Sequence, residues 1–265
     1  MRIRIQLLAL AKNAAVPINY QYPVSAAIYK ILNRASPEYT AFLHNKGYSA
    51  PSGRFMKLFT FSKLYIPHAQ FKDGKLLGDF RQPCHLFVGS PMHEDFVQNF
   101  VLGLFDSSTI EIAGSGVRTR FQVTGVESII KPEFNEEMRF RCLSPIVISR
   151  SEDRENGRMP HYYRPFEEGL NEALRKNLLQ KYQIIYNAFP ENEAFEFQIT
   201  EKDKPRSKKI TIKEGTPHAT ELKAFETYFT LRGNPELMEV AWECGLGEHT
   251  SQGFGMVEVV GESDR

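Results

Sequence analysis

The sequence predicts an α+β protein in which the order strand, helix, strand, strand, helix, strand occurs twice. Three observations support this fold class. Apolar residues alternate with polar ones in some segments, which indicates strands, and recur every three or four residues in others, which indicates helices. The chain has 265 residues, enough for two domains of the common size of roughly 100–150 residues. Hydrophobic residues make up 42% and charged residues 25%, as is typical of a folded globular protein.

In the first half, the clearest local signal is the start of the second helix. Ser36 suits the N-cap position, Pro37 the first helical residue and Glu38 the first turn. Gly47 is of the type favoured just past a helix end. The predicted segments are a strand at 1–10, a helix at 25–34, a helix from 37 to near 47, a loop at 48–54, strands at 55–64 and 75–89, a helix at 93–105 and a strand at 109–130.

In the second half, two helices are well marked. Leu170, Leu174 and Leu178 fall in phase on one helical face, and Asn234 followed by Pro235 is a helix start. The predicted segments are a strand at 139–149, a long polar and mobile connection at 151–165, a helix at 166–186, a hairpin of 193–200 and 208–213 around 202–207, a strand at 224–231, a helix at 235–244 and a strand at 254–260.

A polar stretch with a proline, residues 131–137, separates the two halves and serves as a linker. We therefore predict an N-terminal domain of residues 1–130 and a C-terminal domain of residues 138–265. Each is expected to be an antiparallel sheet with helices on one face. The order of elements in both is that of the ferredoxin-like fold.

Composition excludes several kinds of protein. The cysteines, Cys84, Cys142 and Cys244, lie far apart without CxxC spacing, which argues against a disulfide framework and against a structural zinc site. No apolar run approaches the roughly 20 residues that span a bilayer. The N-terminal apolar stretch is too short and too interrupted for a signal peptide. We expect a cytoplasmic protein with no metal, no cofactor and no membrane partner.

The net charge of +1 conceals an uneven distribution of charge. Residues 1–66 contain nine Lys/Arg and one acid, a net charge of +8, and the remaining residues carry 24 bases and 31 acids, a net charge of −7. The strongly basic first quarter favours a polyanionic partner. For a second basic cluster, a polyanion site and a solvated hairpin with an edge strand protected by lysines both remain open. That cluster is Lys202, Lys204, Arg206, Lys208, Lys209 and Lys213.

The most specific feature is the segment Gly245–Gly255, here called the glycine segment, with glycines at 245, 247, 253 and 255. Backbone N–H groups beside glycine can approach a ligand closely, and a concave run of them can bind phosphate. The segment is neither a Walker A loop, since Gly-Lys-Ser/Thr is absent, nor a dinucleotide-binding fingerprint, since no strand precedes it. Taken alone, it fits a phosphate-binding loop and a tight structural turn equally well.

The repeated pattern glycine–hydrophobic–glycine near the C-terminal end resembles the signature of the RAMP superfamily (repeat-associated mysterious proteins). More narrowly, the chain resembles the CRISPR-associated endoribonucleases that cut repeat RNA into guide RNAs. The resemblance implies two ferredoxin-like domains, the first with the catalytic helix region, and metal-independent cleavage that leaves a 2′,3′-cyclic phosphate and a 5′-hydroxyl. The matching stretches are 1–8, 27–60 with Ile28-Tyr29, Phe42-Leu43-His44 and Lys57-Leu58-Phe59-Thr60, and 245–257.

By this resemblance, the catalytic tyrosine, histidine and lysine fall on Tyr29, His44 and Lys57. Such a reaction removes a proton from the 2′-hydroxyl, protonates the 5′-oxygen and builds negative charge on phosphorus. We expect Tyr29 to orient the 2′-hydroxyl, since its reference pKa of about 10 makes it a poor base. His44 suits a general acid near neutral pH, with His249 as its main rival and His161 as a weaker one. Lys57 would neutralise charge on the phosphate. A half-buried tyrosine, a surface histidine and a plain phosphate contact are the alternatives.

The residues expected to bind RNA come from the basic first quarter, the glycine segment and the second basic cluster. The stretch between His44 and Lys57 is longer than the family pattern, with residues 49–53 as an insertion, so whether Lys57 or Arg54 faces the phosphate is open. The predicted RNA-binding residues are Arg54, Gly245, Gly247, His249, Ser251, Gln252, Gly253, Gly255, Lys204 and Arg206.

Three functions are compared. The first is a repeat-RNA endoribonuclease, the second a non-catalytic RAMP subunit that holds guide RNA within an effector complex, and the third a small-molecule or regulatory ferredoxin-like domain. The combination of Tyr29, His44 and Lys57 favours the enzyme, and the basic first quarter argues against the third. CRISPR repeat RNA is the expected partner, with other subunits of a CRISPR interference complex and a second copy of the chain as further candidates.

Overall fold

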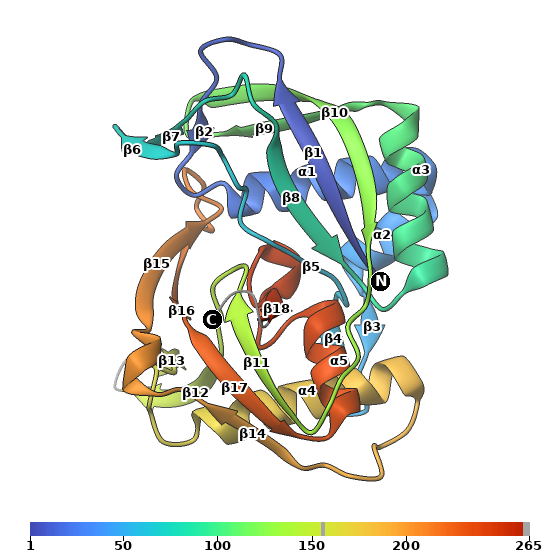
Figure 1. Ribbon diagram of the computed structural model, residues 1–265, viewed down its shortest axis with the longest axis vertical. Helices are drawn as coiled ribbons and strands as arrows, with labels where there is room; N and C mark the ends of the chain where they lie inside the picture. Colours follow the sequence, from blue (N-terminus) through green and yellow to red (C-terminus); the bar gives the residue numbers. More distant parts are fainter. Residues whose placement is uncertain (155–156, 262–265) are drawn as a thin grey trace.

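The computed structural model describes residues 1–154 and 157–261, and Figure 1 shows two α/β halves, one above the other. Each half contains an antiparallel sheet with helices packed against it. The predicted α+β class is therefore confirmed. Among the described residues, no helix is both long enough and apolar enough to cross a membrane.

The first half is built around β1 (Arg2–Ala9), the central strand of a five-stranded sheet of order β5-β8-β1-β10-β9. Ile3, Ile5 and Leu7 alternate along β1 and are buried in the core that the helices cover. The other elements are β2 (Val16–Pro17), α1 (Gln21–Ala35), α2 (Pro37–Asn45), β3 (Tyr48–Ser49), β4 (Phe55–Met56), β5 (Thr60–Phe61), β6 (Gln70–Lys72), β7 (Lys75–Leu77), β8 (Cys84–Gly89), a π-helical turn (His93–Gln98), α3 (Asn99–Asp106), β9 (Thr109–Gly114) and β10 (Val117–Ile129).

The second half has a four-stranded sheet of order β14-β17-β11-β18. Phe140 and Phe229 from neighbouring strands stack in its core with ring centroids 5.7 Å apart, against Leu174 and Leu178 of α4. Its elements are β11 (Glu137–Cys142), β12 (Ser149–Arg154), β13 (Gly157–Tyr162), α4 (Leu170–Tyr186), β14 (Phe195–Gln198), a 3₁₀ turn (Glu201–Asp203), β15 (Arg206–Ile212), β16 (Thr220–Glu226), β17 (Tyr228–Gly233), α5 (Pro235–Cys244), a 3₁₀ turn (Thr250–Gln252) and β18 (Val257–Val259).

A buried arginine joins the two halves. The guanidinium of Arg2 lies 4.1 Å from the ring centroid of Trp242 and donates to the carbonyls of Trp242 (2.5 Å) and Val257 (2.7 Å). Burial lowers the pKa of Arg2 to about 9, because a charge removed from water is destabilised. Nearby, a Cβ on Gly89 would lie 3.0 Å from the carbonyl oxygen of Glu243, so the halves are in close contact here.

Local capping signals were the most accurate predictors of element ends. Ser36 accepts a hydrogen bond from the Tyr39 amide (3.2 Å) and Asn234 from the Glu236 amide (2.8 Å), so both predicted helix starts are confirmed. Helix α5 also ends at residue 244 as predicted. Helix α1 begins earlier than predicted, at Gln21.

Strand lengths and pairings were predicted less well. Residues 55–64 do not form one strand but β4 and β5 with an irregular stretch between them, and 75–89 divides into β7 and β8. The predicted hairpin of 193–200 with 208–213 is wrong, because β14 pairs with β17 and β15 pairs with β16. Tertiary packing decides these pairings, since strands adjacent in sequence compete with distant partners.

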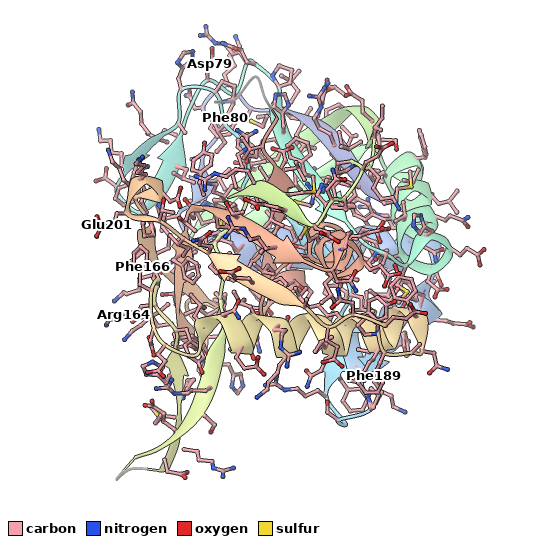
Figure 2. All side chains as sticks on the ribbon, turned by 60° about the horizontal axis from the view of Figure 1, so that its bottom comes forward. Asp79, Phe80, Arg164, Phe166, Phe189 and Glu201 are labelled. Atoms are coloured by element: carbon pink, nitrogen blue, oxygen red, sulfur yellow. The ribbon has the colours of Figure 1, made fainter. Side chains whose placement is uncertain are left out.

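The polar connection predicted at 151–165 is largely a hairpin of β12 and β13, paired from Ser149–Tyr162 to Arg154–Gly157. Figure 2 shows this hairpin projecting from the body of the protein, on the side where Arg164 and Phe166 are labelled. Residues 155–156 of the predicted connection and 262–265 of the predicted second domain lie outside the described residues.

Candidate active site

Helices α1 and α2 bring Tyr29 and His44 together. Ser36 joins the two helices, since its amide donates to the carbonyl of Leu32 in α1 (2.8 Å) and its hydroxyl caps α2. The chain therefore turns back on itself, and the Tyr29 and His44 rings meet edge to face with centroids 5.7 Å apart at 83°. The other side of the Tyr29 ring packs against Phe59, at 5.9 Å.

Lys57 joins this pair from a third segment. Its ammonium donates to the carbonyls of Leu43 and His44 in the last turn of α2, where carbonyl groups lack helical partners. The prediction that Lys57 lies on a strand is wrong: it lies between β4 and β5. The close approach needs Gly47, because a Cβ there would lie 2.6 Å from the Met56 carbonyl oxygen.

The protonation and exposure of these side chains differ. Burial raises the pKa of Tyr29 to about 12, so its hydroxyl keeps its proton at neutral pH and acts as a hydrogen-bond donor. Burial lowers the pKa of Lys57. His44 is exposed, and its Nδ1 lies 3.2 Å from the Asn45 Oδ1. Its Nε2 makes no hydrogen bond within the described part of the chain, which leaves it available to a ligand.

The glycine segment is closely packed at its ends. A Cβ on Gly247 would lie 2.3 Å from the Val147 carbonyl oxygen, and one on Gly255 would lie 2.1 Å from the Leu246 carbonyl oxygen. Both glycines also have positive φ angles, of 84° and 72°, which other residues rarely adopt. Six amides of the segment donate to backbone carbonyls and are thus already hydrogen-bonded within the protein. They are the amides of Gly245, Leu246, Glu248, Gln252, Gly253 and Gly255.

A pocket of about 260 Å³, here called the glycine pocket, brings several predicted residues together. It contains Lys57 and Arg54 on one side and His249 and Ser251 on the other. Gly247 also lines it, whereas Gly245, Gly253 and Gly255 do not, and all four glycines are buried. Arg54 lies 3.3 Å from the Glu248 carboxylate and His249 Nδ1 lies 2.8 Å from the Gln252 side-chain oxygen. Arg54 and Lys57 thus face one pocket.

Two polar residues of α4 that line this pocket were missed by the sequence analysis. Asn177 and Lys181 of α4 line it, and both are buried. Lys181 donates to the carbonyls of Gly245 (2.6 Å) and Gly247 (2.8 Å), and burial lowers its pKa to about 8. The available signal was that both polar residues share the helical face of Leu174 and Leu178.

Lys204 and Arg206 lie elsewhere. They line a larger cavity of about 670 Å³ between the two sheets, here called the basic groove. This groove shares no lining residue with the glycine pocket. Its lining includes the cations Lys63, Arg141, Lys202, Lys204 and Arg206, the aromatic residues Tyr65, Phe87 and Tyr228, and the acids Asp203, Glu226 and Glu258. The structure therefore separates Lys204 and Arg206 from Tyr29, His44 and Lys57. No group of three or more metal-ligating side chains occurs in residues 1–154 and 157–261.

Comparisons with known proteins give consistent results. Family models described as CRISPR-associated protein Cas6, N-terminal, and CRISPR associated protein Cas6, C-terminal, match residues 15–127 and 129–259. The chain is 30% identical over 259 residues to CRISPR-associated endoribonuclease Cas6 1 of Methanocaldococcus jannaschii, which covers 97% of this chain and 92% of that protein. A solved structure titled CRISPR associated protein Cas6 aligns with a TM-score of 0.78 at 30% identity, over 98% of this chain and 99% of that one. Another, titled an RAMP protein binding different RNA substrates, has a TM-score of 0.80 at 23% identity, over 98% of this chain and 100% of that one, and shows the same fold.

Proposed function

The chain belongs to the Cas6 family of CRISPR-associated proteins, and we propose that it is an endoribonuclease that cuts CRISPR repeat RNA into guide RNAs. The observation that carries the proposal is the convergence of Tyr29, His44 and Lys57. These residues come from α1, from α2 and from the stretch after β4, and they meet at the end of α2. A protein that only binds RNA has no need of this combination.

We assign the tandem ferredoxin-like architecture on strand order. With β9, α2 and the strands outside the main sheet left aside, each half follows the order strand, helix, strand, strand, helix, strand: β1, α1, β5, β8, α3 and β10 in the first half and β11, α4, β14, β17, α5 and β18 in the second. In sheet order, the fourth of these strands lies beside the first, then the third, then the second: β10-β1-β8-β5 in one half and β18-β11-β17-β14 in the other. This shared order supports domains of residues 1–130 and 138–265.

The reaction is an internal transesterification. The 2′-oxygen attacks phosphorus and loses its proton, the bond from phosphorus to the 5′-oxygen breaks, and the 5′-oxygen gains a proton. The products are a 2′,3′-cyclic phosphate and a 5′-hydroxyl, and the steps require proton transfer and charge stabilisation but no metal.

Each side chain has a role that suits its environment. Tyr29, with its pKa raised to about 12, donates a hydrogen bond that orients the 2′-hydroxyl, rather than acting as the base. His44 is exposed with a free Nε2 and supplies the proton to the 5′-oxygen. Lys57 uses two N–H groups on helix carbonyls, and its third can reach the phosphate as negative charge builds.

RNA binding is assigned to both cavities. The glycine pocket, which Lys57 also lines, takes RNA near the cut, with contacts from Arg54, His249 and Ser251. Gln252 lies outside the pocket lining, and its side-chain oxygen lies 2.8 Å from the Nδ1 of His249. The glycines at 245, 253 and 255 hold the loop in shape. The basic groove takes a more distant single-stranded part, because its cations suit phosphates and its aromatic rings suit stacked bases.

The test is a cleavage assay in EDTA with repeat RNA from the protein's own source. A second RNA carries a 2′-deoxy nucleotide just upstream of the cut. We expect one cut that the 2′-deoxy group abolishes. Tight binding without cutting would instead support the alternative, a RAMP subunit that holds guide RNA within an effector complex, and neither binding nor cutting would contradict both.

A further inference from the structure

Asn177 has an unmet hydrogen-bonding group inside the glycine pocket. The residue is only 5% exposed, and its side-chain Oδ1 has no hydrogen-bond partner in the described structure. A buried polar atom without a partner is destabilising, and such atoms are uncommon in folded proteins. Because Asn177 also lines the pocket, a ligand bound there can supply the missing partner.

Lys181, one turn further along α4, has a different role. Its ammonium holds the loop through the carbonyls of Gly245 and Gly247. Lys181 therefore shapes the pocket. The Oδ1 of Asn177 accepts no hydrogen bond from the loop, so it has no such structural role. Leucine occupies the neighbouring positions 174 and 178 of the same buried face, so an asparagine is not required there for packing.

The pocket has the size and lining for a single nucleobase. Its volume of about 260 Å³ is just below the range of roughly 300–1,000 Å³ of drug-sized ligand sites, so it suits a group as small as one base. Phe55, Met56 and Leu58 give it an apolar side. Phe55 is 60% exposed and forms no contact with another aromatic ring in the described structure, so its ring is available for base stacking.

The chemistry of Asn177 selects a base over a phosphate. Oδ1 is an acceptor, and phosphate oxygens are also acceptors. A base edge presents donors beside acceptors, and a carboxamide can pair with both. Lys57 and Arg54, in the same pocket, provide positive charge for the phosphates on either side of the base.

We propose that the glycine pocket takes the base of one unpaired nucleotide next to the cut, and that Asn177 reads the edge of that base. This inference rests on the proposed function for its substrate. It makes Asn177 a specificity-determining residue, because RNA is read in sequence mainly where bases are unstacked and their edges exposed.

The test measures Kd for uncleavable repeat RNA with a 2′-deoxy group at the cut. Each nucleotide near the cut is replaced in turn by the other three bases. For wild type, we expect Kd to rise on the order of 10-fold at one position, which is the discrimination given by a paired amide. Asn177→Ala should bind all four bases at that position within about 3-fold of one another. Asn177→Asp, close in shape but without a donor, should change which base is preferred.

The matched control is Gln180→Ala. Gln180 lies on the same helix and also has an unpartnered buried Oε1, but it does not line the pocket. It should keep the wild-type preference, and thermal melting of every variant checks folding. Base preference that persists in both Asn177 variants, or no preference at any position in wild type, would overturn the inference.

Cleavage of the unmodified RNA, measured in parallel, separates the two proposals. A preference that depends on Asn177 without any cleavage would contradict the endoribonuclease and leave base reading in place. Cleavage without a base preference would support the endoribonuclease and contradict base reading by Asn177.

Discussion

The glycine pocket and the basic groove differ in how they hold their cations. In the glycine pocket, Lys57 and Lys181 donate to main-chain carbonyls and are fixed in position. In the basic groove, Lys63 lies 3.0 Å from a Glu226 oxygen and Arg141 lies 2.8 Å from a Glu258 oxygen, while Lys204 and Arg206 form no ion pair within the described residues.

This difference separates cations that are fixed in position from cations that only attract RNA. A cation fixed by carbonyls lies at a defined place when charge develops on a phosphate, which is what catalysis requires. A cation on a flexible exposed stem attracts a polyanion without fixing its position. We therefore expect substitutions of Lys57 and Lys181 to affect rate and stability, and substitutions in the basic groove to affect affinity and its salt dependence.

The largest expected effect is that of His44→Ala. Loss of a general acid should lower the single-turnover cleavage rate by about 10²–10⁴-fold, while Kd for repeat RNA stays within a few-fold. His249→Ala is the comparison, since His249 is the rival acid and lines the glycine pocket. A larger rate loss in His249→Ala than in His44→Ala would exchange their roles, and equal losses of rate and affinity in His44→Ala would make His44 a binding residue.

Lys57→Ala should lower the cleavage rate by about 10²–10³-fold, the usual cost of losing one group that stabilises transition-state charge. The measurement is the single-turnover rate at saturating protein, with thermal melting to account for the lost contacts to α2. Arg54→Ala is the control, because Arg54 is exposed and pairs with Glu248, so it should raise Kd more than it lowers rate. A loss of rate in Arg54→Ala that exceeds its effect on Kd would place Arg54, rather than Lys57, at the phosphate.

Lys181→Met should destabilise the protein by about 2–3 kcal/mol at neutral pH, because two buried carbonyls lose a charged donor. Urea unfolding measures this difference. Lys176→Met, at an exposed position of the same helix with a surface ion pair, should change stability by less than about 1 kcal/mol. Equal effects of the two substitutions would mean that Lys181 does not hold the loop.

The same variant tests the lowered pKa of Lys181. Because the folded-state pKa is about 8 against 10.5 for the free side chain, the unfolded chain binds more protons between these values. The contribution of Lys181 to stability should therefore rise as pH increases from about 8 to 10.5, and the difference between wild type and Lys181→Met should grow. If the difference in free energy of unfolding between wild type and Lys181→Met stays constant or shrinks over this pH range, the pKa of Lys181 is not lowered.

The smallest effect is expected for Lys204→Gln combined with Arg206→Gln. If each contacts one phosphate of single-stranded RNA, the slope of log K against log salt should fall by about 1.4, with little change in the cleavage rate at saturation. Lys209→Gln is the control, since Lys209 lies on the same strand but pairs with Glu221 at 2.7 Å and does not line the groove. An unchanged slope would remove the basic groove from the RNA path.

Much of the architecture could be predicted from local sequence. The starts of α2 and α5 followed from Ser36-Pro37 and Asn234-Pro235, because capping depends on neighbouring residues only. The buried face of α4 followed from its leucine spacing, and the family resemblance, now confirmed, drew on short motifs. The pairing of β14 could not be predicted, since it skips the next two strands and pairs with β17, which leaves β15 to form a hairpin with β16.

The candidate site divides in the same way. Sequence by itself determined the family, the positions of Tyr29 and His44 on two consecutive helices and the location of the glycine segment, because each depends on short-range patterns. Only the tertiary structure decided that Lys57 reaches the end of α2, that Lys204 lies in a separate groove and that Asn177 faces the pocket. These three facts depend on contacts between segments distant in the chain, whose geometry is set by packing rather than by local propensity.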